Sequence, residues 1–389
     1  MPGYQLIENA NFGRNNWCMG LQPLYQHGLL TSLSNGEVHL LDWKTHTTMT
    51  KIKVGDVPIN KLIVINSNYH SESLFATASL DSVKIFDIRD KSCIATIHND
   101  KNSPFLSLDS REGRLACGTE LSGVDAELFI YDIRDFSTPT RGLVDSHHDD
   151  ITDIKFHPSD NNILLSGSTD GYTNIYDLTE EDEDDALHQV INYASIHSCG
   201  WISPRRIYTL SHMETFAISE LNDKSEELKE PQPLDFGDIR DSWGCNYVVD
   251  IYPGYIATGK SQEGKGSLNI MPLVDETPQI GSSITINDAH GDDVIRDVFI
   301  PPQDSQIMYS CGEDGNVKCW KNTTGSLTIP EGFWDYSNKF DVFDTENDLS
   351  MDVNGSVVAI EEETPERHKK KSKKSKSKKS KHVPRYTPY

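Results

Sequence analysis

Short apolar runs recur along residues 1–336, and each run ends at a polar turn. Asp42, Asp87, Asp132 and Asp177 close four of these runs at a constant spacing of 45 residues. The runs are rich in β-branched and aromatic residues, and Asn-Gly or Asp-Gly pairs lie between them, as is typical of hairpin strands. No amphipathic helical pattern of useful length interrupts them, so the pattern predicts an all-β fold.

A second apolar stretch precedes each run and aligns seven copies of a repeat. The aligned positions are Leu30, Ala76, Ala116, Leu165, Tyr208, Ala257 and Tyr309. The intervals between them run from 40 to 52 residues. Repeats of this length that consist of short strands are typical of propellers, in which each repeat forms a four-stranded blade. The sequence therefore predicts a seven-bladed β-propeller over residues 1–336.

The ring of blades has to close. The last copy ends near residue 330, whereas Tyr4–Ile7 are strand-like and precede the first copy. An unpaired edge strand invites pairing with other chains. We therefore expect the N-terminal strand to complete the seventh blade as its outer strand.

Two copies carry polar residues at matching positions. These residues are His147, Ser166, Asp170 and Tyr176 in one copy, and His290, Ser310, Asp314 and Trp320 in the other. The pattern resembles the WD-repeat β-propeller family, in which a His, a Ser or Thr, an Asp and a Trp form a structural hydrogen-bond network within a blade. Tyr176 stands where the family has Trp, which predicts an incomplete network in that blade. The fifth and sixth copies lack the pattern's Asp and Trp.

The charge of the chain is unevenly distributed. The formal net charge is −24, from 36 Lys plus Arg and 60 Asp plus Glu. Residues 367–389 carry +11, so residues 1–366 carry −24 − 11 = −35. Residues 337–366 contain many acids and few apolar residues, a composition that predicts a disordered acidic linker followed by a basic tail at 367–389. A second acidic run, at 180–185, is interpreted as a solvated loop.

The composition of the basic tail predicts a nuclear localisation signal. Its lysines are Lys369, Lys370, Lys371, Lys373, Lys374, Lys376, Lys378, Lys379 and Lys381. Clustered lysines are typical of signals that an import receptor reads, which favours the nucleus, including the nucleolus, with the cytoplasm as a second location. The same cluster could bind nucleic acid by releasing counterions, whereas the acidic body repels phosphate. A solvated tail without a partner is the third interpretation.

Few motifs in the chain point to catalysis or to a cofactor. Gly254–Ser261 fit the phosphate-binding pattern Gly-x4-Gly-Lys-Ser, yet they align with the second strand of the sixth copy and no helix start follows. We therefore interpret the match as chance and keep nucleotide binding only as a remote alternative. The seven cysteines form no Cys-x-x-Cys pair, which favours free thiols in a reducing compartment. We expect no enzyme activity, cofactor or metal.

Two adjacent copies carry an Asp-x-Arg motif, Asp87-Ile88-Arg89 and Asp132-Ile133-Arg134. The motifs resemble those with which WD-repeat substrate receptors dock on the adaptor of cullin ubiquitin ligases. An arginine that braces its own blade against nearby acids is the alternative interpretation.

A propeller without catalytic residues is typically a binding platform. The charge of −35 favours basic partners such as ribosomal proteins or histones, so we expect a nuclear scaffold or escort, in ribosome biogenesis or chromatin. The competing hypothesis is a ubiquitin-ligase substrate receptor. The longest apolar runs are too short to cross a bilayer, so no membrane partner is expected, and the propeller should be monomeric within a complex.

Overall fold

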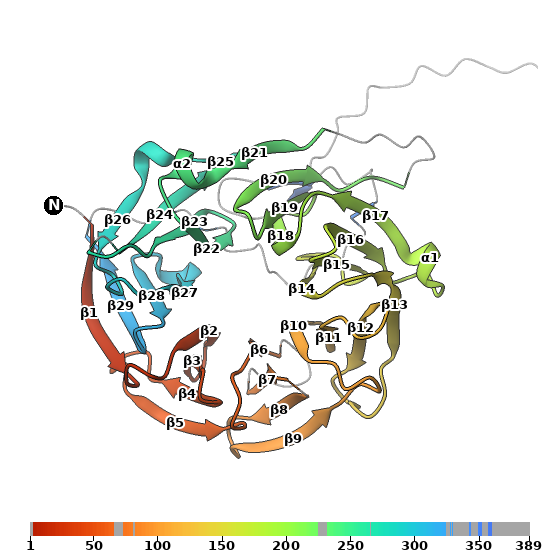
Figure 1. The fold of residues 1–389 in the computed structure, drawn as a ribbon, viewed down its shortest axis with the longest axis horizontal. Helices are drawn as coiled ribbons and strands as arrows, with labels where there is room; N and C mark the ends of the chain where they lie inside the picture. Colours follow the sequence, from red (N-terminus) through yellow and green to blue (C-terminus); the bar gives the residue numbers. More distant parts are fainter. Residues whose placement is uncertain are drawn as a thin grey trace, which may run out of the picture.

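The computed structural model is a ring of seven antiparallel sheets arranged as the blades of a propeller around a central axis (Figure 1). The structure describes residues 3–65, 73–80, 82–224, 232–264, 266–323, 327, 329, 342–343, 349–351 and 357–359. Six of the sheets have four strands, and the sheet of blade 6 has five. The predicted all-β, seven-bladed fold is confirmed.

Blades 1 to 4 each use four consecutive strands. The strands of blade 1 are β2 (Cys18–Leu24), β3 (Gly28–Leu33), β4 (Glu37–Leu41) and β5 (Thr48–Lys53). Those of blade 2 are β6 (Lys61–Val64), β7 (Leu74–Ala78), β8 (Val83–Asp87) and β9 (Ser92–Ile97). Those of blade 3 are β10 (Phe105–Arg111), β11 (Arg114–Thr119), β12 (Ala126–Asp132) and β13 (Arg141–His147). Those of blade 4 are β14 (Ile151–Phe156), β15 (Ile163–Ser168), β16 (Tyr172–Asp177) and β17 (Leu187–Asn192).

The last three blades are less regular. The strands of blade 5 are β18 (Ile196–Ser203), β19 (Arg206–Ser211), β20 (Thr215–Glu220) and β21 (Leu234–Asp238). Those of blade 6 are β22 (Tyr247–Tyr252), β23 (Tyr255–Lys260), β24 (Ser267–Val274), β25 (Thr277–Pro278) and β26 (Ile284–Asn287). Those of blade 7 are β27 (Ile295–Phe299), β28 (Ile307–Gly312), β29 (Asn316–Asn322) and β1 (Tyr4–Asn11). Further short elements are α1 (Glu183–Ala186), α2 (Ile239–Trp243), η1 (Ile280–Ser282), η2 (Pro302–Asp304) and the paired strands β30 (Leu349–Met351) and β31 (Val357–Ala359).

The apolar core is divided among the junctions between blades. Among the described residues, seven clusters of buried side chains each join two neighbouring blades. At the junction of blades 3 and 4, for example, Ala116 and Leu128 pack with Ile154, Phe156 and Tyr176. The second strand of a blade is buried along its whole length, as in β3 and β15, because its two faces contact two neighbours. Each blade therefore depends on both of its neighbours for burial of its apolar side chains.

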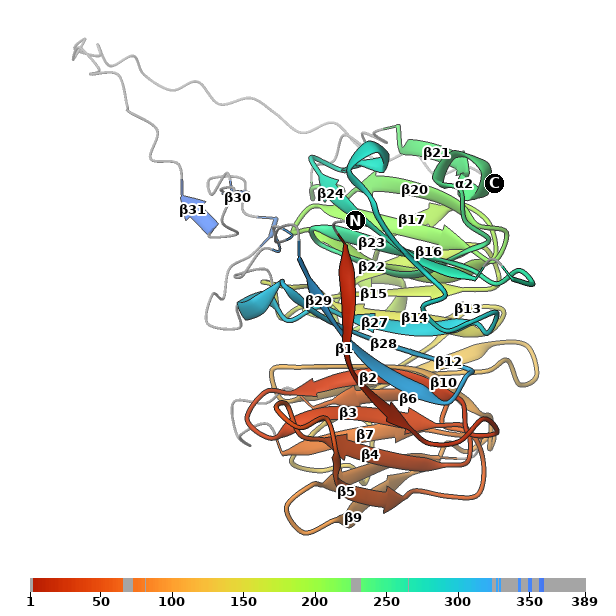
Figure 2. The same cartoon turned by 90° about the vertical axis from the view of Figure 1, so that its left-hand side faces the viewer.

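The ring is closed by strands from both ends of the sequence. Strand β1 pairs antiparallel with β29, from Tyr4 opposite Asn322 to Asn11 opposite Asn316, and forms the outer strand of blade 7. Figure 2 shows β1 lying alongside β29. Five of its eight side chains are exposed in an unbroken run from Gln5 to Asn9, as expected of an outer strand.

Tight turns between the second and third strands of the blades require glycine. Gly36 and Gly315 have φ angles of 78° and 73°, in the left-handed region. A Cβ atom at either position would lie 2.2 Å from a backbone oxygen, of Gly55 or of Gly13. The Asn-Gly and Asp-Gly pairs thus allow both the turn and the close approach of a neighbouring loop.

The acidic run at 180–185 is exposed at all positions except Glu183, as predicted for a solvated loop, but it is also attached to blade 3. It includes the single helical turn α1, and the carboxylate of Glu183 accepts hydrogen bonds from the backbone N–H groups of Val144 (2.8 Å) and Asp145 (3.1 Å). Arg141 donates to the backbone carbonyl of Glu180. The run is therefore fixed against the outer edge of β13, where Glu183 satisfies backbone donors that have no strand to pair with.

Only a few residues of the predicted disordered linker at 337–366 are described. Val342 is buried with 2% exposure, and Phe343 packs beside it against blades 4 and 5. Strands β30 and β31 lie in the same interval. The disorder of the linker stays a prediction, and residues 367–389 lie outside the described residues.

Deleting residues 1–12 removes β1 and leaves β29 with an unpaired edge. Because all seven blade junctions depend on a closed ring, we expect this deletion to lower the midpoint of thermal unfolding strongly and to broaden the transition. Deletion of residues 367–389, which lie outside the propeller, is the control. A melting curve for the N-terminal deletion that matches the full chain would contradict the closure by β1.

Candidate functional site

Blade 7 contains the first polar network. The Trp320 Nε1–H group donates to Ser310 Oγ (2.8 Å), and Ser310 Oγ lies 2.7 Å from His290 Nε2. His290 Nδ1 lies 2.8 Å from Asp314 Oδ1. A carboxylate only accepts, so Nδ1 carries the proton and Nε2 accepts the hydroxyl hydrogen of Ser310. Burial lowers the pKa of His290, which favours this neutral ring.

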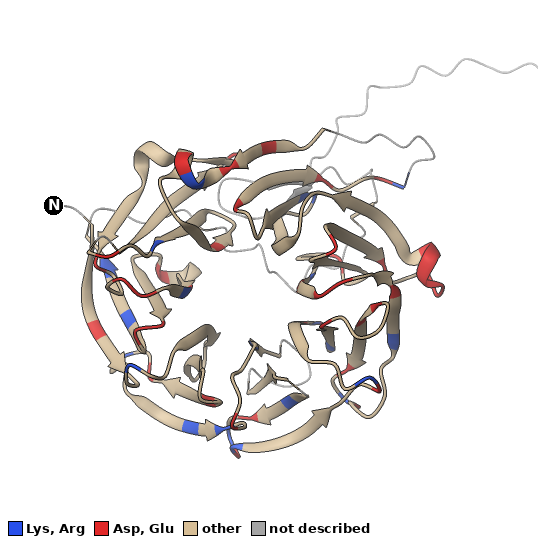
Figure 3. Ribbon diagram, viewed as in Figure 1, with Lys and Arg blue, Asp and Glu red and all other residues tan. Residues whose placement is uncertain are grey.

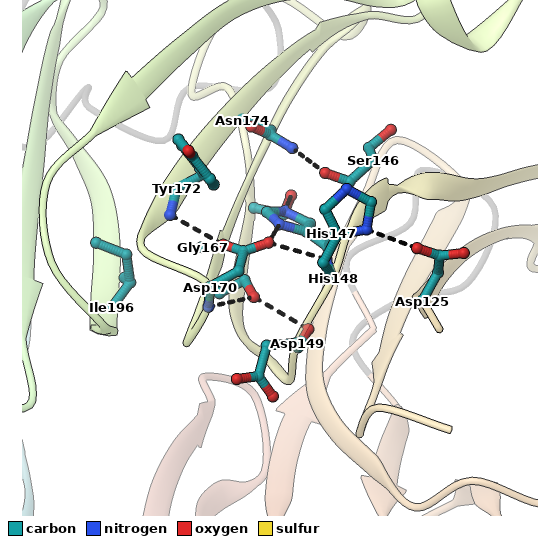
Figure 4. A network of polar contacts seen from close by, with 12 residues as sticks. Asp125, Ser146, His147, His148, Asp149, Gly167, Asp170, Tyr172, Asn174 and Ile196 are labelled. Carbon is teal, nitrogen blue, oxygen red and sulfur yellow. Dashed lines mark hydrogen bonds and ion pairs between the residues drawn. The ribbon is translucent and has the colours of Figure 1, made fainter. Parts of the chain in front are cut away.

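Blade 4 contains the second network, shown in Figure 4. His147 Nε2 lies 2.7 Å from Ser166 Oγ, and His147 Nδ1 lies 2.9 Å from Asp170 Oδ2. Asp170 also accepts the backbone N–H groups of His148 (3.0 Å) and Tyr172 (2.9 Å). Burial alone would raise the pKa of Asp170, but the interaction with His147 and the hydrogen bonds from the Tyr172 and His148 backbone together outweigh it, and the pKa is lowered.

Tyr176 lies beside the network of blade 4, at the position that Trp320 occupies in blade 7. Its side chain is fully buried, and its hydroxyl accepts a hydrogen bond from Asn174 Nδ2 (3.2 Å). The Trp320 N–H group of blade 7 donates directly to its serine. The incomplete network in blade 4 stays a prediction.

Each network combines Ser, His and Asp, as a hydrolase triad does, but the geometry excludes nucleophilic attack. Ser166 and Ser310 are completely buried, and the oxygen of Ser310 already accepts the Trp320 N–H group. A nucleophile has to reach its substrate. The histidines come from the end of β13 and from the segment after β26, so each network joins one blade to the next. The arrangement is a structural tie between blades.

An acidic cavity lies beside the network of blade 7. Its volume is about 660 Å³, and its lining includes Asp288, Asp292, Asp293 and Asp314 together with Arg14 and Lys318. Two of these acids are already engaged: Asp292 accepts the Gly264 N–H group (2.9 Å), and Asp314 contacts Lys318 Nζ (3.2 Å) in addition to His290. Asp288 and Asp293 add further negative charge to the wall. The cavity suits a cationic group more than an anion.

Buried carboxylates also line the inner strands, and the sequence interpretation missed them. Asp153 and Asp297 occupy matching register positions opposite Gly167 and Cys311. Asp153 accepts Ser198 Oγ–H (3.0 Å) and pairs with Lys155 Nζ (2.7 Å), whereas Asp297 accepts the Leu21 N–H group (2.7 Å). The signal that could have found them is an Asp before Ile or Val within an apolar run.

The pKa values of these two carboxylates move in opposite directions. Burial raises the pKa of both, but the ammonium groups of Lys155 and Lys61 reverse this at Asp153 and bring its pKa to about 2. At Asp297 the nearby Asp250 adds to the effect of burial, and the two together exceed the opposing effect of Lys61, so the pKa of Asp297 is raised. Both aspartates bridge neighbouring blades, and their positions inside the ring point to a structural role.

In each of the two predicted Asp-x-Arg motifs, the arginine side chain hydrogen-bonds to the carboxylate of the aspartate two residues earlier. We call this arrangement an arginine clasp. Arg89 donates to both carboxylate oxygens of Asp87, with Nε at 3.0 and 3.1 Å, and Arg134 does the same with Asp132 at 2.9 and 3.1 Å. The hydrogen bonds from Arg134 lower the pKa of Asp132 to about 2. The arginine side chains are 57% and 64% exposed. The clasps therefore brace their own turns and still present part of each guanidinium to solvent.

A third clasp of this type was not found in the sequence. Arg240 donates through Nε to Asp238 at 3.0 and 3.2 Å, at the start of α2 in blade 5. It lacks the preceding aromatic strand residue of the other two motifs, so the repeat alignment did not reveal it. The same Asp-Ile-Arg geometry thus occurs in blades 2, 3 and 5.

Gly254–Ser261 do not form a phosphate loop. Gly254 occupies the turn before β23, and Tyr255–Lys260 are the strand itself. A Cβ atom at Gly259 would lie 2.2 Å from the ring of Tyr247, whose hydroxyl accepts the Ile295 N–H group (2.8 Å) from blade 7. Glycine is thus required here by a tyrosine that links two blades. A phosphate loop needs a helix N-terminus after the glycines, and β23 is followed by a turn and β24.

Other features carry no chemistry within the described residues. Six cysteines are buried and Cys93 is exposed. In the described part of the chain, no three His, Cys, Asp or Glu side chains are grouped to hold a metal ion. None of the described helices has the length and apolar character needed to cross a membrane. The lysines of the predicted import signal, Lys369 to Lys381, lie outside the described residues.

Comparison with known proteins identifies related chains. A family model described as "WD domain, G-beta repeat" matches residues 139–177 and 281–321, the two segments that contain the polar networks. An uncharacterized WD repeat-containing protein of Saccharomyces cerevisiae is 60% identical over 372 residues, which cover 95% of this chain and 96% of that protein.

More distant relatives share parts or most of the chain. The WD repeat-containing protein 89 homolog of Dictyostelium discoideum is 29% identical over 84% of this chain and 92% of that protein. Histone acetyltransferase type B subunit 2 of Candida glabrata is 28% identical over 46% of this chain and 39% of that protein.

Replacing His147 by alanine should destabilise the propeller. The change leaves Ser166 and Asp170 buried without their shared partner, and buried polar groups that lose a partner cost about 1–3 kcal/mol each. We expect the free energy of unfolding, measured in urea, to fall by about 2 kcal/mol or more.

The adjacent His148 provides the matched control. Its side chain is 67% exposed and contacts only Asp125 at the surface (2.6 Å), so His148→Ala should leave the unfolding midpoint nearly unchanged. Equal effects of the two substitutions would contradict the structural role of the network.

Proposed function

The chain belongs to the WD-repeat β-propeller family, and we propose that it is a non-catalytic scaffold or escort that binds basic proteins in the nucleus. WD-repeat propellers act through protein partners, which the loops and faces of the ring contact. The partners we propose are ribosomal proteins or histones, in ribosome biogenesis or chromatin.

The observation that carries this proposal is the charge of the propeller. Acidic positions recur in the loops around the ring, with α1 among them (Figure 3). The cavity beside the blade 7 network concentrates Asp288, Asp292 and Asp293 at one place. Such a surface attracts basic proteins over distances comparable to the Debye length, about 8 Å at physiological salt, and selects against acidic ones. The partial similarity to a histone acetyltransferase subunit supports histones as one class of partner.

The exposed arginine clasps support a second function, that of a substrate receptor of a cullin ubiquitin ligase. Arg89 and Arg134 lie after the third strands of adjacent blades, and each has more than half of its side chain exposed. Purification of the tagged full chain from cells should recover cullin and adaptor if this function holds. The pair of changes Arg89→Ala and Arg134→Ala should then abolish that recovery, whereas Arg240→Ala, in the third clasp, should not.

Binding of purified core histones to the full chain should be strong at low salt and weaken steeply as salt increases. We expect the triple variant Asp288→Asn, Asp292→Asn and Asp293→Asn to raise Kd about tenfold and to flatten the salt dependence, because it removes three charges from the cavity wall. Fluorescence titration at 50 to 300 mM salt measures both quantities.

The control variant removes the same number of charges elsewhere. Asp56, Asp90 and Glu181 are exposed acids in loops of other blades, and their replacement by Asn or Gln leaves the cavity intact. This variant should bind with nearly wild-type affinity. Failure of the full chain to bind histones or basic ribosomal proteins at low salt would overturn the proposal.

The basic tail is proposed to direct the protein into the nucleus through an import receptor. Residues 367–389 fused to a fluorescent protein should accumulate in the nucleus, with enrichment in the nucleolus, because the lysines present a dense row of charges to an acidic receptor groove. Replacing Lys369, Lys370, Lys371, Lys373 and Lys374 by glutamine should abolish the accumulation. A uniformly cytoplasmic wild-type fusion would refute the import signal.

A further inference from the structure

Two residues from the C-terminal segment pack against the propeller at the junction of blades 4 and 5. Val342 is 2% exposed and belongs to the apolar cluster between blades 4 and 5, with Leu165, Cys199 and Trp201. Phe343 packs against the same cluster from its edge. Neither residue belongs to a strand of a blade, so this junction buries a side chain supplied from outside the blades, as the junction of blades 6 and 7 does with Leu327 and Ile329.

Both backbone groups of Val342 are bound by side chains of the propeller. Its N–H group donates to Asp160 Oδ2 (2.9 Å), and its carbonyl oxygen accepts from Arg205 Nη2 (2.9 Å). Asp160 lies in the β14–β15 turn, and Arg205 lies in the β18–β19 turn of the next blade. Main-chain hydrogen bonds combined with pockets for side chains are the basis on which proteins recognise extended peptides.

The groups that hold the peptide are fixed by the propeller itself. Asp160 is 4% exposed, its backbone N–H group donates to His157 Nδ1 (2.8 Å), and its second carboxylate oxygen accepts the Asn162 N–H group (2.8 Å). A carboxylate held in this way is in position before a ligand arrives. Preorganisation of this kind lowers the cost of binding.

Phe343 lies between two further side chains. The rings of His188 and Phe343 have their centroids 4.5 Å apart, and Lys224 Nζ lies 4.8 Å from the centroid of the Phe343 ring. His188 is held by a hydrogen bond to the carbonyl of Asn222 (2.9 Å), and Lys224 pairs with Asp177. An aromatic side chain gains from both an edge contact and a cation over its face.

We propose that Asp160, His188, Arg205 and Lys224 form a binding site, the blade 4–5 peptide site, for an extended segment of a partner protein that carries an aliphatic residue followed by an aromatic one. Val342–Phe343 are its built-in competitor. The contacts involve a backbone and two apolar side chains, which any such segment supplies. Asp160 and Asp170 lie at opposite ends of β15, so this site and the networks lie on opposite faces of the ring.

The length of the linker before Val342 sets how strongly Val342–Phe343 compete with a partner segment for the site. Ile329 is anchored in the cluster of blades 6 and 7, so only residues 330–341 separate it from Val342. A short linker gives an effective concentration of about 1 mM. If a free peptide of this sequence binds with a Kd of about 0.1 mM, the tethered copy weakens the binding of a competing peptide about tenfold. A partner can therefore displace the segment only if it binds well or is itself held nearby.

The test uses the full chain and a fluorescent peptide of residues 338–347. In the variant Val342→Asp plus Phe343→Asp the site is open, and fluorescence anisotropy should show the peptide binding at least tenfold more tightly than to the wild-type chain. Adding Arg205→Ala to the open variant should weaken this binding at least tenfold. Arg240→Ala, which removes an exposed arginine elsewhere on blade 5, should have no effect. A peptide with Asp at both positions should not bind.

The peptide experiment distinguishes binding at the blade 4–5 peptide site from binding driven by the acidic surface of the propeller. The peptide carries Asp341, Asp344 and Glu346 against one lysine, so its binding cannot come from attraction to the acidic propeller. Equal affinity for the open and wild-type chains, no binding to either, or indifference to Arg205→Ala would overturn the proposal. If the open variant does not fold, hydrogen exchange on the wild-type chain decides: excess peptide should speed exchange at Val342 and Phe343, and unchanged exchange would overturn the proposal.

Discussion

The interaction on which the rest of the structure depends is the packing of each blade against two neighbours. No blade has an apolar core of its own, because the clusters lie at the junctions, and a blade removed from the ring would expose both faces to water. Because every blade needs two neighbours, the blades have to form a closed ring. That ring is complete only when blade 7 obtains its fourth strand. Strand β1 supplies it, and the first and last strands of the ring thereby become neighbours in one sheet.

Polar side chains reinforce the same junctions. His147 and His290 reach from the edge of one blade to a serine and an aspartate of the next, Tyr247 accepts a backbone N–H group of blade 7, and Asp297 accepts one of blade 1. Each of these groups is buried or half-buried, so each hydrogen bond offsets a desolvation cost that would otherwise oppose folding. The residues of the Ser-His-Asp arrangement and of the Gly-x4-Gly-Lys-Ser pattern serve contacts between neighbouring blades. This explains why both patterns occur in the chain although neither forms a catalytic or phosphate-binding site.

The sequence predicted the fold because the repeat is visible in the strands themselves. The column from Leu30 to Tyr309 falls in the second strand of every blade, including blades 5 and 6, where the polar pattern is missing. Long-range contacts between non-equivalent positions were harder to predict. The hydrogen bond that Glu183 accepts from the edge of β13 and the burial of Val342 both depend on which segments meet in space. In composition, Glu183 and Val342 belong to charged segments, and composition alone predicted solvated or disordered chain for both.

The two faces of the ring differ in chemistry, because one is acidic and the other has an apolar contact site. They also differ in how clearly the sequence indicated them. One face presents the turns that hold the networks, beside a cavity lined by aspartates, and favours association through charge. On the opposite face, the apolar cluster between blades 4 and 5 packs against Val342, and Asp160 and Arg205 bind the backbone of that residue. Charge acts over several ångströms and weakens with salt, whereas the apolar cluster acts only on contact and is insensitive to salt. A scaffold with both can attract a basic protein on one face while it holds an unrelated segment on the other. Because Val342–Phe343 already occupy this contact site, the second interaction depends on displacing part of the protein's own chain.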